Sequence, residues 1–167
     1  MFEEVAAIGG LDIQLVYYRG LRECVSSRWI ADARTLGGLM ERINCRTGMT
    51  QIGRVLAHAG VENARQKVQA LVFVGDAMEE TPADLYAAAR ELGLPVFLFQ
   101  EGDDSEATRV FREIARLTKG AHCRFDPGSA KQLGELLRAV AVYAAGGVKA
   151  LSGSGNAGAL KLLQQLR

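Results

Sequence analysis

Residues 67–80 read KVQALVFVGDAMEE, and this stretch decides the fold class. The residues from Ala70 to Val74 form an unbroken apolar run with β-branched and aromatic members, and Gly75 and Asp76 follow it. A short apolar run that a glycine stops predicts a strand buried on both faces. Burial on both faces requires helices above and below the sheet, so the run predicts a parallel α/β fold.

Asp76 falls at the carboxyl end of this predicted strand. In open parallel sheets the ligand crevice lies beyond the carboxyl ends of the strands, which makes Asp76 a candidate site residue. An aspartate in that position can hold a cation, a ribose or a phosphoryl group, or it can cap the turn before Met78. Its position alone does not choose among these roles.

The composition fits one soluble globular domain of 167 residues, with 49% apolar residues, 23% charged residues and a net charge of +1. This charge balance does not favour binding to nucleic acid or to an anionic membrane. No apolar run reaches the roughly 20 residues of a membrane span, and the opening MFEEVAAIGG has no basic segment of a signal peptide. We therefore expect a cytoplasmic protein with no membrane and no nucleic-acid partner.

The cysteines Cys24, Cys45 and Cys123 are odd in number, widely spaced and without a Cys-x-x-Cys pair. This pattern favours reduced thiols over a disulfide framework or a zinc site. His122 stands beside Cys123, but only His58 remains to complete a metal site, so we interpret the pair as a buried thiol next to a surface imidazole.

Strands alternate with amphipathic helices along the chain. The predicted strands are 12–18, a short edge strand 22–26 that returns from it as a hairpin, 70–74, 95–99 and 122–125, and the predicted helices are 30–43, 50–63, 82–92, 105–118 and 129–145. Residues 2–8 have the spacing of the end of a helix. These elements predict a three-layer α/β/α, Rossmann-like sheet over residues 1–145, mostly parallel with one antiparallel edge strand. Residues 146–167 are rich in glycine and serine and predict a flexible tail with a short helix.

Three segments resemble von Willebrand factor A domains in the same order. GMTQIGRVLAHA, residues 48–59, is similar to the Gly-x-Thr-x-Ile-Gly segment of that family. LVFVGDAMEE, residues 71–80, resembles its apolar strand ending in Thr-Asp-Gly, and FREIARLTKGAHCRF, residues 111–125, resembles its late helix and strand. The resemblance covers residues 1–145 and implies a doubly wound sheet.

The family resemblance also implies a metal-ion-dependent adhesion site, in which Thr50 matches the threonine of the second loop and Asp76 the aspartate of the third. Mg²⁺ prefers oxygen ligands of this kind, and an open coordination position accepts a carboxylate of a partner protein. The function implied is therefore that of a non-catalytic protein-interaction module.

The family's Asp-x-Ser-x-Ser loop, and the strand that carries it, are absent from these 167 residues. That loop supplies most of the metal ligands, so we expect Mg²⁺ binding to be weak or absent. In the family the missing strand pairs with the counterparts of residues 12–18 and 70–74. We expect the exposed edges of these two strands to promote a homodimer by strand exchange, or aggregation. Residues 151–166 are one candidate segment to fill the gap left by the missing strand.

Each candidate site residue has a structural alternative. Thr50 could be a helix N-cap, which needs no metal. Glu79 and Glu80 are more typical of solvated charges that face a helix N-terminus than of ligands. Asp103 and Asp104 follow a later strand and are expected to face solvent.

The alternative function is a small phosphoacceptor or nucleotide-binding α/β domain that uses Asp76. A receiver domain would need an acidic pair near the first strand and a lysine after a late strand, and neither is evident. The chain has no Gly-x-Ser-x-Gly elbow, no matched nucleophile and base, and no cluster of acids for a hydrolase. We therefore expect no enzyme activity.

Overall fold

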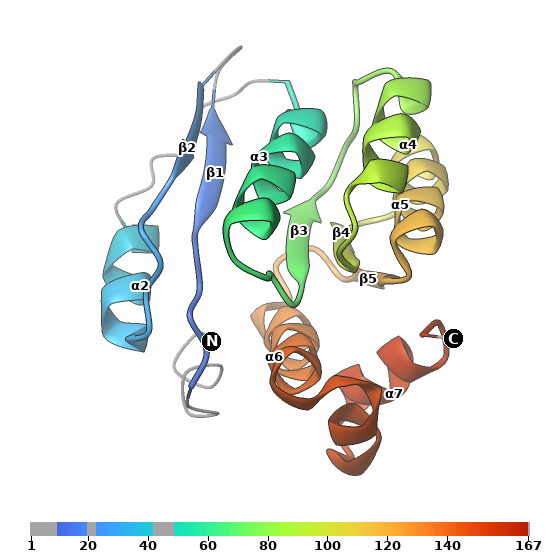
Figure 1. The fold of residues 1–167 in the computed structure, drawn as a ribbon. Coiled ribbons are helices and arrows are strands. Elements are labelled where there is room, and N and C mark those ends of the chain that lie inside the picture. The colour runs from blue at the N-terminus through green and yellow to red at the C-terminus, as the bar shows by residue number, and fades with distance from the viewer. Residues whose placement is uncertain (1–9, 20–22, 42–48, 167) are drawn as a thin grey trace.

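The computed structural model describes residues 10–19, 23–41 and 49–166 (Figure 1). Its elements are β1 (Val16–Arg19), β2 (Glu23–Ser26), α2 (Ala33–Glu41), α3 (Ile52–Arg65), β3 (Leu71–Gly75), α4 (Pro82–Glu91), β4 (Val96–Glu101), α5 (Ser105–Thr118), β5 (Ala121–Phe125), α6 (Ala130–Gly153) and α7 (Ala157–Leu163). The helix end expected at residues 2–8 and the thiol of Cys45 lie outside the described residues.

The main sheet is parallel, with strand order β3-β4-β5. One hydrophobic cluster joins β3 and β4 to α3, α4 and α5, and a second joins β4 and β5 to α6 and α7. Helices therefore cover both faces of the sheet (Figure 1). The predicted three-layer α/β/α, Rossmann-like fold class is confirmed.

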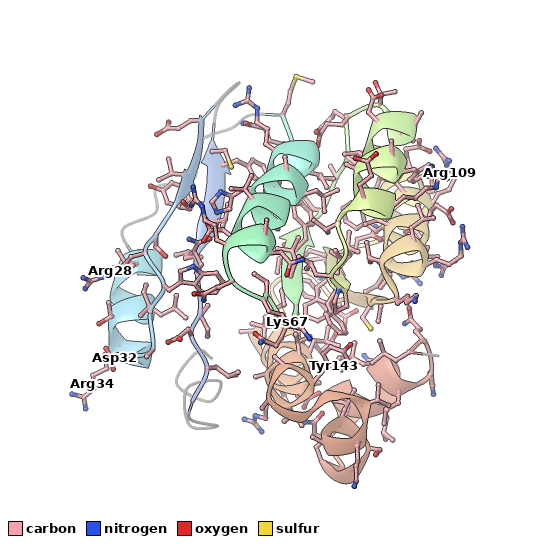
Figure 2. All side chains as sticks on the ribbon, viewed as in Figure 1. Arg28, Asp32, Arg34, Lys67, Arg109 and Tyr143 are labelled. Atoms are coloured by element: carbon pink, nitrogen blue, oxygen red, sulfur yellow. The ribbon has the colours of Figure 1, made fainter. Side chains whose placement is uncertain are left out.

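β4 is the centre of the core. The residues from Val96 to Phe99 have no exposed surface, and successive side chains enter the two clusters alternately. Phe97 packs edge-on against Tyr143 of α6, with ring centroids 5.0 Å apart (Figure 2). A two-sided apolar strand thus occurs as predicted at residues 95–99.

β3 differs from its prediction, because it is an edge strand of its sheet and only partly buried. Phe73 is buried, but the side chain of Val74 is 43% exposed. The physical reason is that β4 covers one side of β3, while no strand of the described residues pairs with the other side. The apolar run predicts the strand correctly but overstates its burial, and the open edge agrees with the exposed edge expected from the missing strand.

β1 and β2 form a separate antiparallel hairpin, in which Val16 lies opposite Ser26 and Tyr18 opposite Cys24. The prediction placed residues 12–18 in the main sheet. In the structure, no ladder joins β1 to β3 among the described residues, although Figure 1 shows both strands running in the same direction with α3 lying across the space between them. The hairpin is correct, but it belongs to a sheet of its own.

Residues 146–166 are folded, which corrects the expectation of a flexible tail. Gly146 and Gly147 have non-helical backbone angles, with φ 66° and ψ −162° at Gly147, and they kink α6. Beyond the kink the chain remains helical, and Leu151 and Leu162 are fully buried against the second face of the sheet. None of the helices in the described part of the chain is both long and apolar enough to cross a membrane.

Candidate functional site

The N-terminus of α3 is held by two carboxylates from the loop that follows β3. Glu80 accepts hydrogen bonds from the backbone N–H groups of Ile52 and Gly53, the latter at 3.0 Å. These N–H groups lie in the first turn, have no partner within the helix and sit at the positive end of its dipole. Glu80 therefore caps a helix that lies about 27 residues before it in the chain.

Thr50 is bound to the neighbouring carboxylate. Its backbone N–H and its Oγ1 donate to Glu79 Oε2 at 2.9 and 2.7 Å, and the N–H of Glu79 donates back to Thr50 Oγ1 at 3.2 Å. The Thr50 hydrogen bonds hold the pKa of Glu79 below its usual value. Thr50 is buried and precedes α3, whose N-cap residue is Gln51, so it is not the N-cap that one alternative predicted.

Asp76 is exposed just beyond β3, at the carboxyl end where the sequence placed it. Tyr18 of β1 lies close enough to Asp76 for the charge of that carboxylate to affect the pKa of the Tyr18 hydroxyl. Burial first, and then the charges of Asp76, Glu79 and Glu80, raise the pKa of Tyr18 to about 12. Three carboxylates thus gather at one end of the sheet, near Tyr18 and the start of α3.

The described residues fit a Mg²⁺ site poorly. Mg²⁺ demands near-octahedral oxygen coordination, and the hydroxyl of Thr50 is already engaged by Glu79. No group of three or more His, Cys, Asp or Glu side chains in the described part of the chain is arranged to hold a metal ion. Thr50 and Asp76 remain a proposed pair of ligands rather than a completed donor set.

Two of the five residues of β3 have backbone groups that pair with no strand among the described residues. In a parallel ladder, alternate residues bond to the same neighbouring strand. The N–H of Leu71 donates to Pro95 O at 3.0 Å, so Leu71, Phe73 and Gly75 bond toward β4. The backbone groups of Val72 and Val74 therefore point away from β4, where no described strand pairs with them.

β1 also has one edge that pairs with no strand among the described residues. Ser27 N donates to Leu15 O at 2.8 Å, so Leu15 and the odd-numbered residues after it bond toward β2. The backbone groups of Val16 and Tyr18 point the other way. The ring of Tyr18 stacks on the ring of Phe73 with centroids 6.3 Å apart and planes 6° apart, so side chains join β1 and β3 where backbone bonds do not.

α3 connects the hairpin to the rest of the molecule. His58 Nε2 and Gln14 Oε1 lie 2.8 Å apart, and Trp29 Nε1 donates to Glu62 Oε2 at 2.9 Å. On its other side the helix is held by Glu79 and Glu80, as described above. Among the described residues, β1 is thus held beside β3 by contacts with α3, by the Tyr18 ring and by packing of Val16 on the first cluster.

The remaining candidate acids have structural roles or face solvent. Asp104 is the N-cap of α5, and its carboxylate accepts from Ala107 N at 2.7 Å. Asp103 is exposed, as expected. Gln100 was not expected from the sequence as a partner of His122; it is fully buried, and its Oε1 lies 3.0 Å from His122 Nε2. His122 is therefore buried beside the buried thiol of Cys123, and its expected surface position is wrong.

Comparison with known proteins does not assign a family. Scans against family models and searches of curated proteins and of solved structures gave no match. The resemblance to von Willebrand factor A domains therefore rests on the sequence segments themselves, and the function is argued below from the geometry of the residues.

Proposed function

We propose that this chain is a non-catalytic protein-interaction module that receives an extended segment of a partner protein between β1 and β3. The observation that supports it is a pair of strand edges with no partner strand among the described residues, formed by the backbones of Val16 and Tyr18 on β1 and of Val72 and Val74 on β3. Unpaired edges recruit further strands, and strand addition is a recurrent mode of peptide recognition.

The side chains around these edges specify an apolar partner. Val16, Tyr18 and Leu71 pack against the first hydrophobic cluster, and Ala70 and Val72 pack against the second. A strand inserted here would have apolar surroundings on both faces, so alternate apolar side chains pointing each way suit it best. This proposal extends the protein-binding role that the family resemblance implies, and it requires no metal ion.

A strand-mimicking peptide tests the proposal without knowledge of the natural partner. The probe is a fluorescent peptide with the sequence of residues 67–75, KVQALVFVG, extended by lysines for solubility. We expect saturable binding by fluorescence anisotropy. A control peptide with N-methylated backbone amides keeps every side chain but loses its donors, and it should bind far more weakly. Equal binding of both peptides would contradict recognition of the strand edge.

A matched pair of variants examines the same edge from the protein side. Val74→Pro removes an N–H that points away from β4, so the ladder with β4 is retained while the edge is blocked. Val74→Thr keeps the N–H and the β-branched shape at a side chain that is 43% exposed. We expect peptide binding to be lost in the proline variant and kept in the threonine variant. Binding that survives in Val74→Pro would overturn the proposal.

Without a partner, the same edges should pair with a second copy of the chain. We therefore expect a homodimer or larger species in light scattering, and a shift toward monomer in Val74→Pro but not in Val74→Thr. A stable monomer in the unmodified chain would show that the strand edges do not pair with a second copy of the chain. The peptide-binding measurement would then be the test of the proposal.

The metal-dependent form of the interaction gives a separate expectation. Thr50 and Asp76 are the proposed ligands, and the partner would supply a carboxylate to the ion. Because the described residues offer few free oxygens, calorimetry should show weak or no heat on addition of Mg²⁺. Tight Mg²⁺ binding that Asp76→Asn abolishes would favour a metal-bridged partner over the inserted strand.

A further inference from the structure

A cavity of about 450 Å³ lies along the outer edge of β5, at the opposite side of the sheet from β3. Its lining residues come from α5, the turn after it, β5 and the C-terminal segment, and they are Arg112, Ala115, Arg116, Gly120, His122, Arg124 and Gln165. The volume lies in the range of small-molecule sites. Three guanidinium groups around one cavity concentrate positive charge in a chain whose net charge is only +1.

The secondary structure brings these groups together. Arg112 and Arg116 are four residues apart on α5, and so lie on one face of the helix. His122 and Arg124 alternate on β5 and share the sheet face that α5 covers, because Ala121, Cys123 and Phe125 fill the opposite cluster. The arginines of the two elements thus line one cavity.

The positive charge of the cavity is largely uncompensated. Arg116 pairs with Glu113, whose Oε1 lies 2.7 Å from its Nη2. Arg112 and Arg124 have no ion pair within the part of the chain that the structure describes. His122 stays neutral near pH 7, because burial, followed by the charges of Arg112 and Arg124, lowers its pKa to about 4. Two guanidinium groups are therefore available for an anion.

The backbone beside the arginines is closely packed and hydrogen-bonded. Gly120 lies so close to β4 that an added Cβ would stand 1.9 Å from Val96 O, so the chain has no side chain at this point of the cavity. Gln165 Oε1 accepts from the N–H of His122 at 2.9 Å, and Gln165 Nε2 donates to His122 O at 2.7 Å. The close approach of Gly120 to β4 and the Gln165 hydrogen bonds thus position the backbone of β5, which carries Arg124.

We propose that this cavity binds the phosphate group of a small phosphorylated molecule. Guanidinium groups donate paired hydrogen bonds to phosphate oxygens, and arginines from two elements can approach a tetrahedral dianion from different sides. The cavity volume exceeds that of a phosphate alone, so it leaves room for the remainder of the molecule. This site is independent of the proposed strand-binding function, since it uses the other edge of the sheet.

Binding of inorganic phosphate and of pyrophosphate, measured by calorimetry and by amide chemical shifts, tests the proposal on the whole chain. Sodium chloride at matched ionic strength controls for screening. We expect both anions to bind and to shift the amides of Gly120, His122 and Arg124. A molecule with an organic group attached to the phosphate should bind more tightly than phosphate alone if the extra volume is used.

Arg112→Gln and Arg124→Gln are the test variants, and Arg109→Gln is the matched control. Arg109 lies on the same helix and pairs with Glu106 as Arg116 pairs with Glu113, but it donates to Tyr86 of α4 and is not among the residues that line the cavity. Each test variant should weaken binding about tenfold or more, as the loss of hydrogen bonds to a charged group predicts, and the control should change it less than about twofold.

Two outcomes would overturn the proposal. The first is an absence of phosphate and pyrophosphate binding at millimolar concentrations. The second is an equal loss in Arg109→Gln, which would show a general effect of surface charge. All three arginines are exposed, so their variants should fold, and unchanged amide spectra away from the cavity would establish this in each case. Peptide binding at the β3 edge should be the same in these variants as in the unmodified chain.

Discussion

The two edges of the β3-β4-β5 sheet differ in how their backbone groups are bonded. At the β5 edge, the side-chain amide of Gln165 bonds to both the N–H and the C=O of His122, as a neighbouring strand would. At the β3 edge, the backbones of Val72 and Val74 have no strand beside them in the described residues. Proteins normally cover or block sheet edges, because open edges pair with other chains. The contrast agrees with the proposal that a partner strand is received at the β3 edge.

The difference also shows how the hairpin is attached. Side chains such as Tyr18, His58 and Trp29 hold β1 and β2 next to β3, and no backbone ladder does so among the described residues. A few side-chain hydrogen bonds, each worth about 1 kcal/mol, can be broken without unfolding the sheet. The hairpin is therefore attached through side-chain hydrogen bonds and through packing on the first cluster, whereas the backbone of the β5 edge is bonded by Gln165.

The largest expected effect concerns the C-terminal cover of the β5 edge. Leu162 of α7 is fully buried in the second cluster, so Leu162→Ala should lower the free energy of unfolding by about 2–5 kcal/mol. Leu160, in the same helix, is 59% exposed, and Leu160→Ala should change it by less than about 0.5 kcal/mol. Denaturant melts of the two variants measure this. Equal, small effects would mean that α7 does not stabilise the sheet.

A smaller effect, specific to pH, is expected from His122. Its pKa is about 4 in the folded chain, against an ordinary value of 6.5. The unfolded chain therefore binds the proton more tightly, and stability is full above pH 6.5 and falls as the pH drops toward 4. The shift corresponds to a loss of at most about 3 kcal/mol. Unfolding free energies measured across this range, in the unmodified chain and in a neutral variant, report it.

His122→Gln is the control for this titration. It removes the titrating ring but keeps a polar side chain beside Gln100, so its stability should depend less steeply on pH between 6.5 and 4. Carboxylates with lowered pKa values, such as Glu79, also lose stabilising interactions in acid, and they contribute equally to both proteins. Parallel pH profiles in the two proteins would show that His122 is not responsible.

Gln165→Ala makes the β5 edge resemble the β3 edge. Loss of the amide leaves the N–H and C=O of His122 without their present partners, which should cost about 1–3 kcal/mol. Gln164→Ala, at the exposed neighbouring position, should cost much less. If open edges are adhesive, the Gln165 variant should also self-associate more strongly in light scattering. A variant that is equally stable and monomeric would contradict the comparison of the two edges.

Local sequence patterns predicted most elements of the fold. The helix at residues 105–118 was placed at the bounds that the structure has, and the strands around Phe73, Phe97 and Cys123 were placed within about two residues. Periodicity and caps are local signals, so a single sequence carries them. The open edge of β3 was expected only from the strand missing relative to the resembled family, and the apolar run itself did not indicate it, because strand order depends on contacts between distant residues. The packing of residues 146–166 was missed because glycine and serine content outweighed Leu151 and Leu162 in the interpretation.

The candidate site was predicted less completely. Asp76 stands at the carboxyl end of β3 as expected, and Glu79 and Glu80 do face a helix N-terminus. That helix is α3 rather than α4, which follows them directly, and nothing local distinguishes the two. The pairing of Gln165 with His122 likewise joins residues 43 positions apart. Such contacts depend on the packed fold, so the sequence pattern of either partner does not reveal them.

The smallest expected effect concerns the cap that holds α3, and through it the hairpin, beside the open β3 edge. Glu80→Gln keeps a side-chain acceptor near the N–H groups of Ile52 and Gly53 but removes its charge, which should cost about 0.3–1 kcal/mol. Glu80→Ala removes the acceptor too and should cost about 0.5–2 kcal/mol, as the loss of a helix cap does. Because α3 carries the His58 and Trp29 contacts, a loosened cap should also increase amide hydrogen exchange in β1 more than in β5. Uniform exchange in both strands would show that α3 does not control the position of the hairpin.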